Sequence, residues 1–131
     1  MKVISKKSKL SGKITVPGSK SHTIRALLLA SMADGVSHIS NPLPSNDCLS
    51  TAAAVQKIGA KIDFGEKDSN VWTVYGAGKN LHLPSDVVNV GNSGSLLYFL
   101  SPIAATFEGD SVFTGDASIV NGLSFEGMNN V

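Results

Sequence analysis

The chain is 131 residues long, with a formal net charge of +1 and 6% aromatic residues. This length allows one domain, which buries roughly two-thirds of its unfolded surface. The charge balance, without a basic tail or stripe, excludes a general nucleic-acid binder. The low aromatic content excludes a surface on which bases stack.

The cysteine count and the apolar runs indicate the compartment. The single cysteine, Cys48, excludes an internal disulfide framework and fits a reducing environment. The basic N-terminus is not followed by an apolar stretch of signal-peptide length, and the longest strongly apolar run, residues 26–30, is too short to cross a bilayer. We therefore expect a cytoplasmic protein that does not contact a membrane.

The first elements expected are a strand over residues 13–18, stopped by Pro17 and Gly18, and a helix after it. Ser19 or Ser21 serves as the N-cap of this helix, and Gly35 is its expected terminator. Its apolar positions have helical spacing: Ile24, Leu27, Leu28 and Met32.

A strand, a second helix and a hairpin complete the first half. Residues 36–40 read as a strand, and a loop leads to an N-cap at Ser45 or Asn46. The second helix stops at Gly59 and carries one face made of Cys48, Thr51, Val55 and Ile58. Residues 60–65 and 70–76 are two strands joined by a polar turn, which predicts a hairpin.

The second half begins the same order again. Residues 86–91 read as a strand, residues 92–109 as a helix, and residues 110–115 as a strand. The inward positions of this helix are Leu96, Leu100, Ile103 and Phe107. Pro102 falls inside it and should kink it or cost up to about 3 kcal/mol.

The second half of the chain repeats the first half at a fixed offset in residue number. Gly18 corresponds to Gly91 (91 − 18 = 73), and the same offset sets residues 38–40 against 111–113 and Arg25 against Tyr98. The sequence thus predicts one strand-helix-strand-helix-strand-strand unit followed by part of a second. The helix that begins near Asp47 should recur near Val120.

The first strand-to-helix junction carries a candidate anion site. Gly18 lets a ligand approach the backbone, Ser19 and Ser21 offer hydroxyls, and Lys20 places a cation at a helix N-terminus, where free N–H groups already favour an anion. Arg25 lies one turn after Ser21 and offers a planar fork for phosphate or carboxylate. The alternative is a capped helix with solvated cations, and spacing alone leaves both open. The Walker A pattern is absent.

The second junction has the same design. Asn92 and Ser93 can cap the helix, and Gly94 again permits close approach of a ligand. A simple N-cap also explains these residues, but two such junctions at one offset indicate that both helix N-termini point into one site.

Other polar residues have simpler explanations. Asp47 is a first-turn carboxylate that favours the helix dipole, or a partner for a nearby cation or a substrate hydroxyl. His22 and His38 read as surface or satisfied core residues, and Cys48 as a packing residue. Neither a metal-ligand spacing nor a nucleophile–base pair is visible in the sequence.

These motifs resemble a known family. The stretch Gly-Ser-Lys-Ser-x-x-x-Arg at residues 18–25, with its Ala/Leu-rich helix, precedes Ser-Asn-Asp at 45–47, Gly-Asn-Ser-Gly-Ser at 91–95 and Thr-Gly-Asp at 114–116. In order and spacing they are similar to the enolpyruvyl transferases, specifically the EPSP synthases (3-phosphoshikimate 1-carboxyvinyltransferases). The UDP-N-acetylglucosamine branch is less similar, because it has Asn where this chain has Ser21.

The resemblance covers nearly all of these residues but matches only the N-terminal part of the family's longer chain. It implies an α/β (α+β) fold built from repeated βαβαββ units, in two domains with the substrates between them. On this basis residues 1–131 are a single, incomplete domain. Residues 1–17 are strands that join the other domain, 18–85 are the first unit, and 86–131 are part of the second.

The resemblance also implies roles for residues. Lys20 would be the catalytic residue and contact both shikimate 3-phosphate and phosphoenolpyruvate, while Ser21 and Arg25 would hold shikimate 3-phosphate. The substrate-binding residues implied at the other elements are Asp47, Asn92 and Gly94. In the family reaction the 5-hydroxyl of shikimate 3-phosphate adds to C2 of phosphoenolpyruvate and phosphate is eliminated, with no cofactor or metal.

The chain departs from the family pattern at two sites, which comprise three residues. Tyr98 stands where the family has an arginine, and Gly122 and Leu123 stand where it has an Arg-Pro pair. The chain is therefore expected to be inactive alone, as part of an EPSP-synthase-like enzyme that needs a complementing C-terminal chain. The alternative is a non-catalytic remnant or anion-binding module with the same fold. An exposed apolar face on the second unit predicts self-association.

Overall fold

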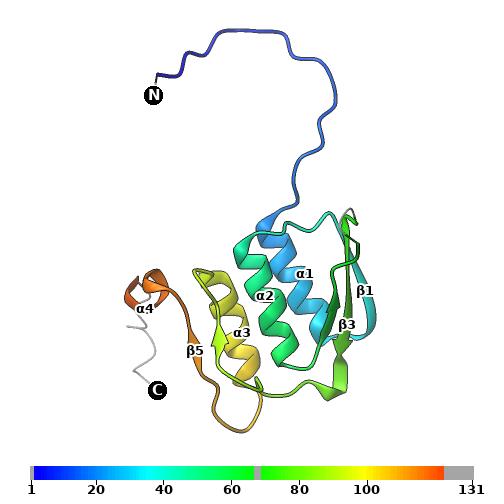
Figure 1. Ribbon diagram of the computed structural model, residues 1–131, viewed down its shortest axis with the longest axis vertical. Helices are drawn as coiled ribbons and strands as arrows, with labels where there is room; N and C mark the ends of the chain where they lie inside the picture. The colour runs from blue at the N-terminus through cyan, green and yellow to red at the C-terminus, as the bar shows by residue number, and fades with distance from the viewer. Residues whose placement is uncertain (1, 67–68, 123–131) are drawn as a thin grey trace.

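The computed structural model describes residues 2–66 and 69–122 (Figure 1). Their elements follow in this order: α1 (Lys20–Met32), β1 (Asp34–Ser40), α2 (Asn46–Lys57), β2 (Lys61–Asp63), β3 (Val71–Ala77), the 3-10 turn η1 (Gly78–Asn80), β4 (Val88–Asn89), α3 (Gly94–Ala104), β5 (Phe113–Thr114) and α4 (Ala117–Gly122). In the described residues, no helix combines the length and the apolar character that a membrane crossing requires.

The helices form a central layer between two sheets. Helices α1, α2 and α3 lie side by side, with the sheet β1-β3-β2 against one side and the pair β4-β5 against the other (Figure 1). One apolar core runs through both halves and includes Leu27 of α1, Val55 of α2, Val74 of β3 and Leu100 of α3. The two halves are therefore packed as one unit.

Helix α1 has the apolar face that the sequence predicts. Ile24 and Leu27 are fully buried, and Ser19 is the N-cap, its hydroxyl accepting the N–H of His22 at 3.4 Å. The prediction that Gly35 terminates the helix is wrong, because the helix ends at Met32 and Gly35 already belongs to β1. The chain becomes extended at Ala33 and enters the strand directly.

The second helix and the hairpin are confirmed. Helix α2 begins after Ser45, and its predicted apolar face is buried, ending at Ile58 before Gly59, which has a φ of +111°. Strands β2 and β3 are antiparallel with Lys61 opposite Tyr75, and β1 pairs antiparallel with the other side of β3. This makes β3 the central strand and leaves one side of β1 without a neighbouring strand in the described sheet.

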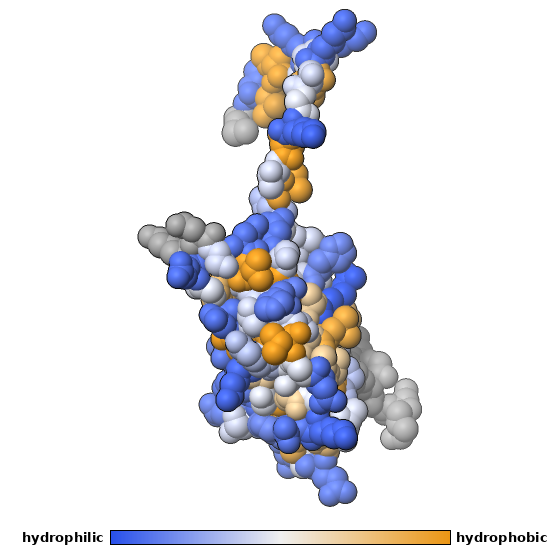
Figure 2. Space-filling model, turned by 90° about the vertical axis from the view of Figure 1, so that its right-hand side faces the viewer, coloured by the Kyte–Doolittle hydropathy of each residue, from blue (hydrophilic) through white to orange (hydrophobic). Residues whose placement is uncertain are grey.

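The strand expected over residues 13–18 does not form in this structure. Residues 2–19 contain no helix or strand, and they extend away from the body as a narrow arm (Figures 1 and 2). Ile14 is 88% exposed and Val16 62% exposed. A strand requires a partner for its backbone groups, and here this segment has none beside it. That residues 1–17 join another domain stays a prediction.

The second half is shorter in its regular elements than expected. Helix α3 ends at Ala104, two residues after Pro102, so Phe107 lies beyond it and is partly buried rather than inward on a helix. Strands β4 and β5 pair in parallel, and α4 begins at Ala117, close to the helix expected near Val120. Leu123, the other residue expected to depart from the family pattern here, lies outside the described residues.

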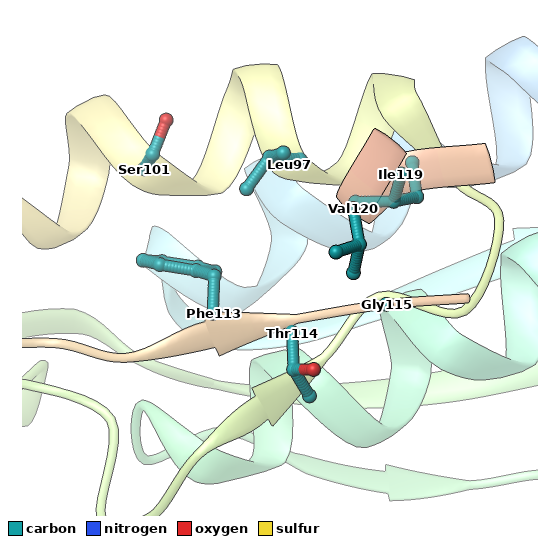
Figure 3. Close-up of a pocket in the computed structure, with 7 residues that line it drawn as sticks. All are labelled: Leu97, Ser101, Phe113, Thr114, Gly115, Ile119 and Val120. Atoms are coloured by element: carbon teal, nitrogen blue, oxygen red, sulfur yellow. The ribbon is translucent and has the colours of Figure 1, made fainter. Parts of the chain in front are cut away.

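A hollow of about 400 Å³ lies between α3, β5 and α4. Leu97, Phe113 and Val120 reach into it from these three elements (Figure 3). None of its lining residues is charged. It is therefore a mainly apolar groove in the second half, and the side chains that line it carry no positive charge for a phosphate.

Candidate functional site

The N-termini of α1, α2 and α3 lie at the same end of the helical layer (Figure 1). This end carries Lys20 as the first residue of α1, Asp47 in the first turn of α2, and the loop of residues 91–93 before α3. Because each helix N-terminus presents backbone N–H groups that have no partner within the helix, this end of the molecule favours anions.

Lys20 and Asp47 form an ion pair between the first two helices. The Nζ of Lys20 donates to Oδ2 of Asp47 at 2.7 Å, and the two side chains are 52% and 14% exposed. The hydrogen bond and the charge of Asp47 raise the pKa of Lys20 above its ordinary value of 10.5. Of the readings that the sequence left open for Asp47, the geometry therefore supports the partner of a cation.

The ion pair with Asp47 fixes the position of the Lys20 ammonium group. A lysine paired to a carboxylate is held in one place, yet half of its side chain stays open to an incoming ligand. Behind it, the Sγ of Cys48 lies 3.7 Å from the carbonyl oxygen of Lys20 and accepts from the hydroxyl of Ser45 at 3.3 Å. Cys48 is fully buried, as expected for a packing residue.

Ser21 and Arg25 are exposed on α1. Arg25 lines a hollow of about 250 Å³ between α1 and α3, together with Leu29 and Phe99. Arg25 therefore lies beside α3, whereas Lys20 is paired with a residue of α2. Tyr98, one residue before Phe99, is 52% exposed.

His22 and His38 have the simple roles expected of them. His22 is exposed on α1. His38 lies on β1, where its Nδ1 is 3.2 Å from the hydroxyl of Thr73 on β3. This bond ties two neighbouring strands together.

Gly18 makes room for the chain itself. A Cβ added at Gly18 would overlap the carbonyl oxygen of Asn41 and lie 3.0 Å from the backbone N of Leu43. The loop of residues 41–43 therefore occupies the side of Gly18 where a Cβ would point. Gly18 allows close packing of two backbone segments.

At the second junction the chain makes a tight turn, and Gly94, the first residue of α3, has free space on its side-chain side. Gly91 has a φ of +60°, and its N–H donates to the side-chain oxygen of Asn89 at 2.9 Å. Ser93 is the N-cap, accepting the N–H of Leu96 at 3.3 Å, while Asn92 is exposed. A Cβ at Gly94 would meet nothing within 4 Å, so its backbone is accessible.

Two residues at this end were missed in the sequence. Asp116 caps α4: its Oδ1 accepts the N–H of Ser118 at 2.9 Å and the N–H of Ile119 at 3.3 Å, while its own N–H donates to the carbonyl of Gly91 at 2.9 Å. Hydrogen bonds from Ser118 lower the pKa of Asp116 below 3.8. An Asp two residues before a Ser at a helix start was the available signal.

The other missed residue is Ser50 of α2. Its Oγ would lie 3.2 Å from a Cβ at Gly91. The loop before α3 therefore rests against the first turns of α2, which joins the second junction to the Lys20–Asp47 pair through one helix.

Comparison with known proteins identifies the family of this chain. A family model described as EPSP synthase (3-phosphoshikimate 1-carboxyvinyltransferase) matches residues 4–121. The 3-phosphoshikimate 1-carboxyvinyltransferase of Acetivibrio thermocellus is 52% identical over 114 residues, 87% of this chain and 26% of the relative. That of Methanococcus aeolicus is 44% identical over 121 residues, 92% of this chain and 28% of the relative.

Solved structures show the same fold. EPSP synthase from Acinetobacter baumannii superposes with a TM-score of 0.75 at 36% identity, over 84% of this chain and 24% of that one. The mixed helix and strand architecture is thereby confirmed, while the division into repeated units stays a prediction. The chain spans about a quarter of the length of the relatives it matches. Because the family model covers residues 4–121, the chain belongs to the EPSP synthase family.

Proposed function

We propose that this chain serves as the N-terminal portion of an EPSP synthase. In that enzyme the enolpyruvyl group passes from phosphoenolpyruvate to the 5-hydroxyl of shikimate 3-phosphate, in aromatic amino-acid biosynthesis. The observation that carries the proposal is the Lys20–Asp47 pair at the N-termini of α1 and α2, in a chain that matches the family over residues 4–121. A cation held at two helix N-termini suits a phosphorylated substrate.

The proposed roles are those that the family resemblance implies for residues of the two junctions. Lys20 contacts both substrates, with Ser21 and Arg25 holding shikimate 3-phosphate. Asn92 and Gly94 line the place of phosphoenolpyruvate, which the open surroundings of Gly94 support. Asp47 fixes the position of Lys20 through the 2.7 Å bond.

We expect this chain to be inactive by itself. Enzymes lower barriers by roughly 8–23 kcal/mol, and one preorganised donor in a water-excluded site contributes about 2.7–4 kcal/mol. Lys20, Ser21, Arg25 and Asn92 are all exposed here, so water screens them. Catalysis then requires a complementing C-terminal chain that closes over the same end of the helices.

The test is an amide NMR titration of the chain with shikimate 3-phosphate. We expect shifts around Lys20, Ser21 and Arg25, and an affinity at least about tenfold lower for Lys20→Ala, because an ionic hydrogen bond contributes about 1.5–3 kcal/mol. Lys57→Ala is the matched control, since Lys57 also pairs with an aspartate, Asp86, at 3.2 Å. An unchanged affinity for Lys20→Ala would remove the proposed role of Lys20.

A non-catalytic module with the same fold is the second candidate. Tyr98 favours it, because a half-exposed phenol stands on α3 where the family resemblance implies an arginine. Activity regained on adding the C-terminal portion of a relative would exclude this candidate. Binding of shikimate 3-phosphate without any regained activity would support it.

A further inference from the structure

The side chain of Thr23 links two segments of the chain that are far apart in the sequence. Thr23 lies in the first turn of α1 and is 3% exposed. Its hydroxyl donates to the carbonyl of Ser19 at 2.9 Å and accepts the N–H of Leu43 at 3.0 Å. One buried hydroxyl therefore bridges the start of α1 and the loop that leads to α2.

Both ends of this bridge lie next to the ion pair. Ser19 directly precedes Lys20, whose Nζ is 2.7 Å from Oδ2 of Asp47. On the other side, the carbonyl of Leu43 accepts the N–H of Ser45 at 2.9 Å, and Ser45 is the N-cap of α2. A chain of hydrogen bonds thus runs from the residue before the lysine to the helix start that carries the aspartate.

The start of α2 has little else to fix it locally. The hydroxyl of Ser45 makes no cap bond to an N–H of α2, and it donates to the Sγ of Cys48 at 3.3 Å instead. Pro42 and Pro44 have no N–H groups. Leu43 therefore supplies the one backbone N–H through which residues 42–44 can be tied to α1, and that N–H is bound by Thr23.

The geometry points to Thr23 as a positioning residue for the proposed reaction: its hydroxyl sets the start of α2 against the start of α1, and so holds Asp47 beside Lys20. Because an N–H···O bond is lost by about 3.6 Å, a shift of roughly 1 Å at the start of α2 separates the pair. The effect on the substrate rests on the proposed function, whereas the effect on the ion pair does not. Thr23 is buried, so it acts on a ligand through Lys20.

The pKa of Lys20 reports whether the pair is intact, since the hydrogen bond to Asp47 and the charge of Asp47 raise it. Thr23→Val has a similar shape but neither donates nor accepts, and we expect it to lower the pKa of Lys20 toward 10.5. The measurement is a pH titration of the Lys20 Cε signal by NMR, with Asp47→Asn giving the value for complete loss of the pair. An unchanged pKa in Thr23→Val would overturn the inference.

Thr23→Ser keeps the hydroxyl and is the milder change. It should retain the Lys20 pKa of the original chain, and a fall toward the value of Asp47→Asn would contradict the role of the hydroxyl. This variant decides the question even where Thr23→Val does not fold.

Ser31→Ala separates positioning from a general loss of stability. Ser31 is fully buried near the other end of α1, and its hydroxyl donates to the carbonyl of Leu28 at 2.7 Å. We expect Ser31→Ala and Thr23→Val both to unfold at lower urea concentration, while Thr23→Val alone changes the pKa of Lys20. An equal change of that pKa in both variants would show that any loosening of α1 disturbs the pair, and the inference would be wrong.

Binding of shikimate 3-phosphate connects this role to the proposed function. We expect Thr23→Val to weaken binding roughly three- to tenfold, the range that follows from the loss of one hydrogen bond between neutral groups. In an Asp47→Asn background the same substitution should have no further effect, because Thr23 acts through the pair. A further loss of affinity in that background would overturn the inference. If the original chain does not bind shikimate 3-phosphate, the proposed function fails, and the pKa values still decide the role of Thr23.

Discussion

Replacing Gly18 by alanine separates two explanations for the first glycine of the Gly-Ser-Lys-Ser motif. In the structure the loop of residues 41–43 presses on Gly18, and an added Cβ would lie 3.0 Å from the backbone N of Leu43, where ordinary contacts are 3.4–4 Å. It would overlap the carbonyl of Asn41 more severely. Both neighbours are backbone atoms, so they cannot rotate away as a side chain could.

The expected cost follows from this crowding. The loop must move by at least 0.4 Å at Leu43 (3.4 − 3.0 = 0.4) and by more at Asn41. Inserting a methyl group into a closely packed place typically costs about 1–3 kcal/mol of the free energy of unfolding. For a chain of 131 residues the melting temperature falls by roughly 4 °C per kcal/mol, where the ranges for smaller and larger domains meet.

The assay is urea unfolding followed by the fluorescence of Trp72. This single tryptophan is 5% exposed, and its ring meets that of Phe64 edge-on with centroids 5.1 Å apart, so its emission should change when the core opens. Gly94→Ala is the control, because a Cβ there meets nothing within 4 Å. We expect it to leave the stability unchanged or to raise it by up to about 1 kcal/mol.

One combination of results would refute the reasoning. If Gly18→Ala unfolds at the same urea concentration as the original chain but no longer binds shikimate 3-phosphate, the glycine serves the ligand and not the loop. The opposite result for Gly94→Ala, a loss of stability, would show that the space around α3 is more closely packed than described.

Two further changes test the core and the cap of α4. Leu100→Ala should lower the free energy of unfolding by about 2–5 kcal/mol, because Leu100 is fully buried. Leu29→Ala is the control, since Leu29 is 66% exposed, and it should change the free energy of unfolding by less than about 0.5 kcal/mol. Equal effects of the two substitutions in urea unfolding would contradict the described packing. Asp116→Ala should destabilise the chain at neutral pH. Since the folded pKa of Asp116 lies below 3.8, this contribution is present above pH 3.8 and is lost as the pH falls through the folded value, so the two unfolding curves should converge in acid. A gap that stays constant down to pH 2 would show that the charge has no part in the cap.

The elements with strong local signals could be predicted from the sequence. Helices α1 and α2 have apolar residues at helical spacing, and β2 and β3 are joined by a short polar turn, so each is specified by neighbours in the chain. The segment of residues 13–18 has an equally clear alternation, yet it forms no strand here. A strand also needs a partner edge, and the sequence of the segment does not say whether one is available.

The candidate site was predictable in its residue types and less so in its contacts. A cation at a helix N-terminus can be read from residues 18–25, because it is local. The pairing of Lys20 with Asp47 joins residues 27 apart, and the sequence left it as one of several readings. The role of Gly18 could not be found, since its neighbour, the loop of residues 41–43, reaches it only through the packing of β1 against α1.

The different sizes of the two sheets imply that the chain opens unevenly. Strand β3 is paired on both sides, with β1 along seven positions and with β2 along three, whereas β4 and β5 pair at two positions. Amide protons exchange with solvent most slowly where many bonds must open together. In heavy water the amides of Val88 and Val90 should therefore exchange while that of Val74 is still protected, so the part of α2 that β4 contacts becomes transiently exposed in the native protein.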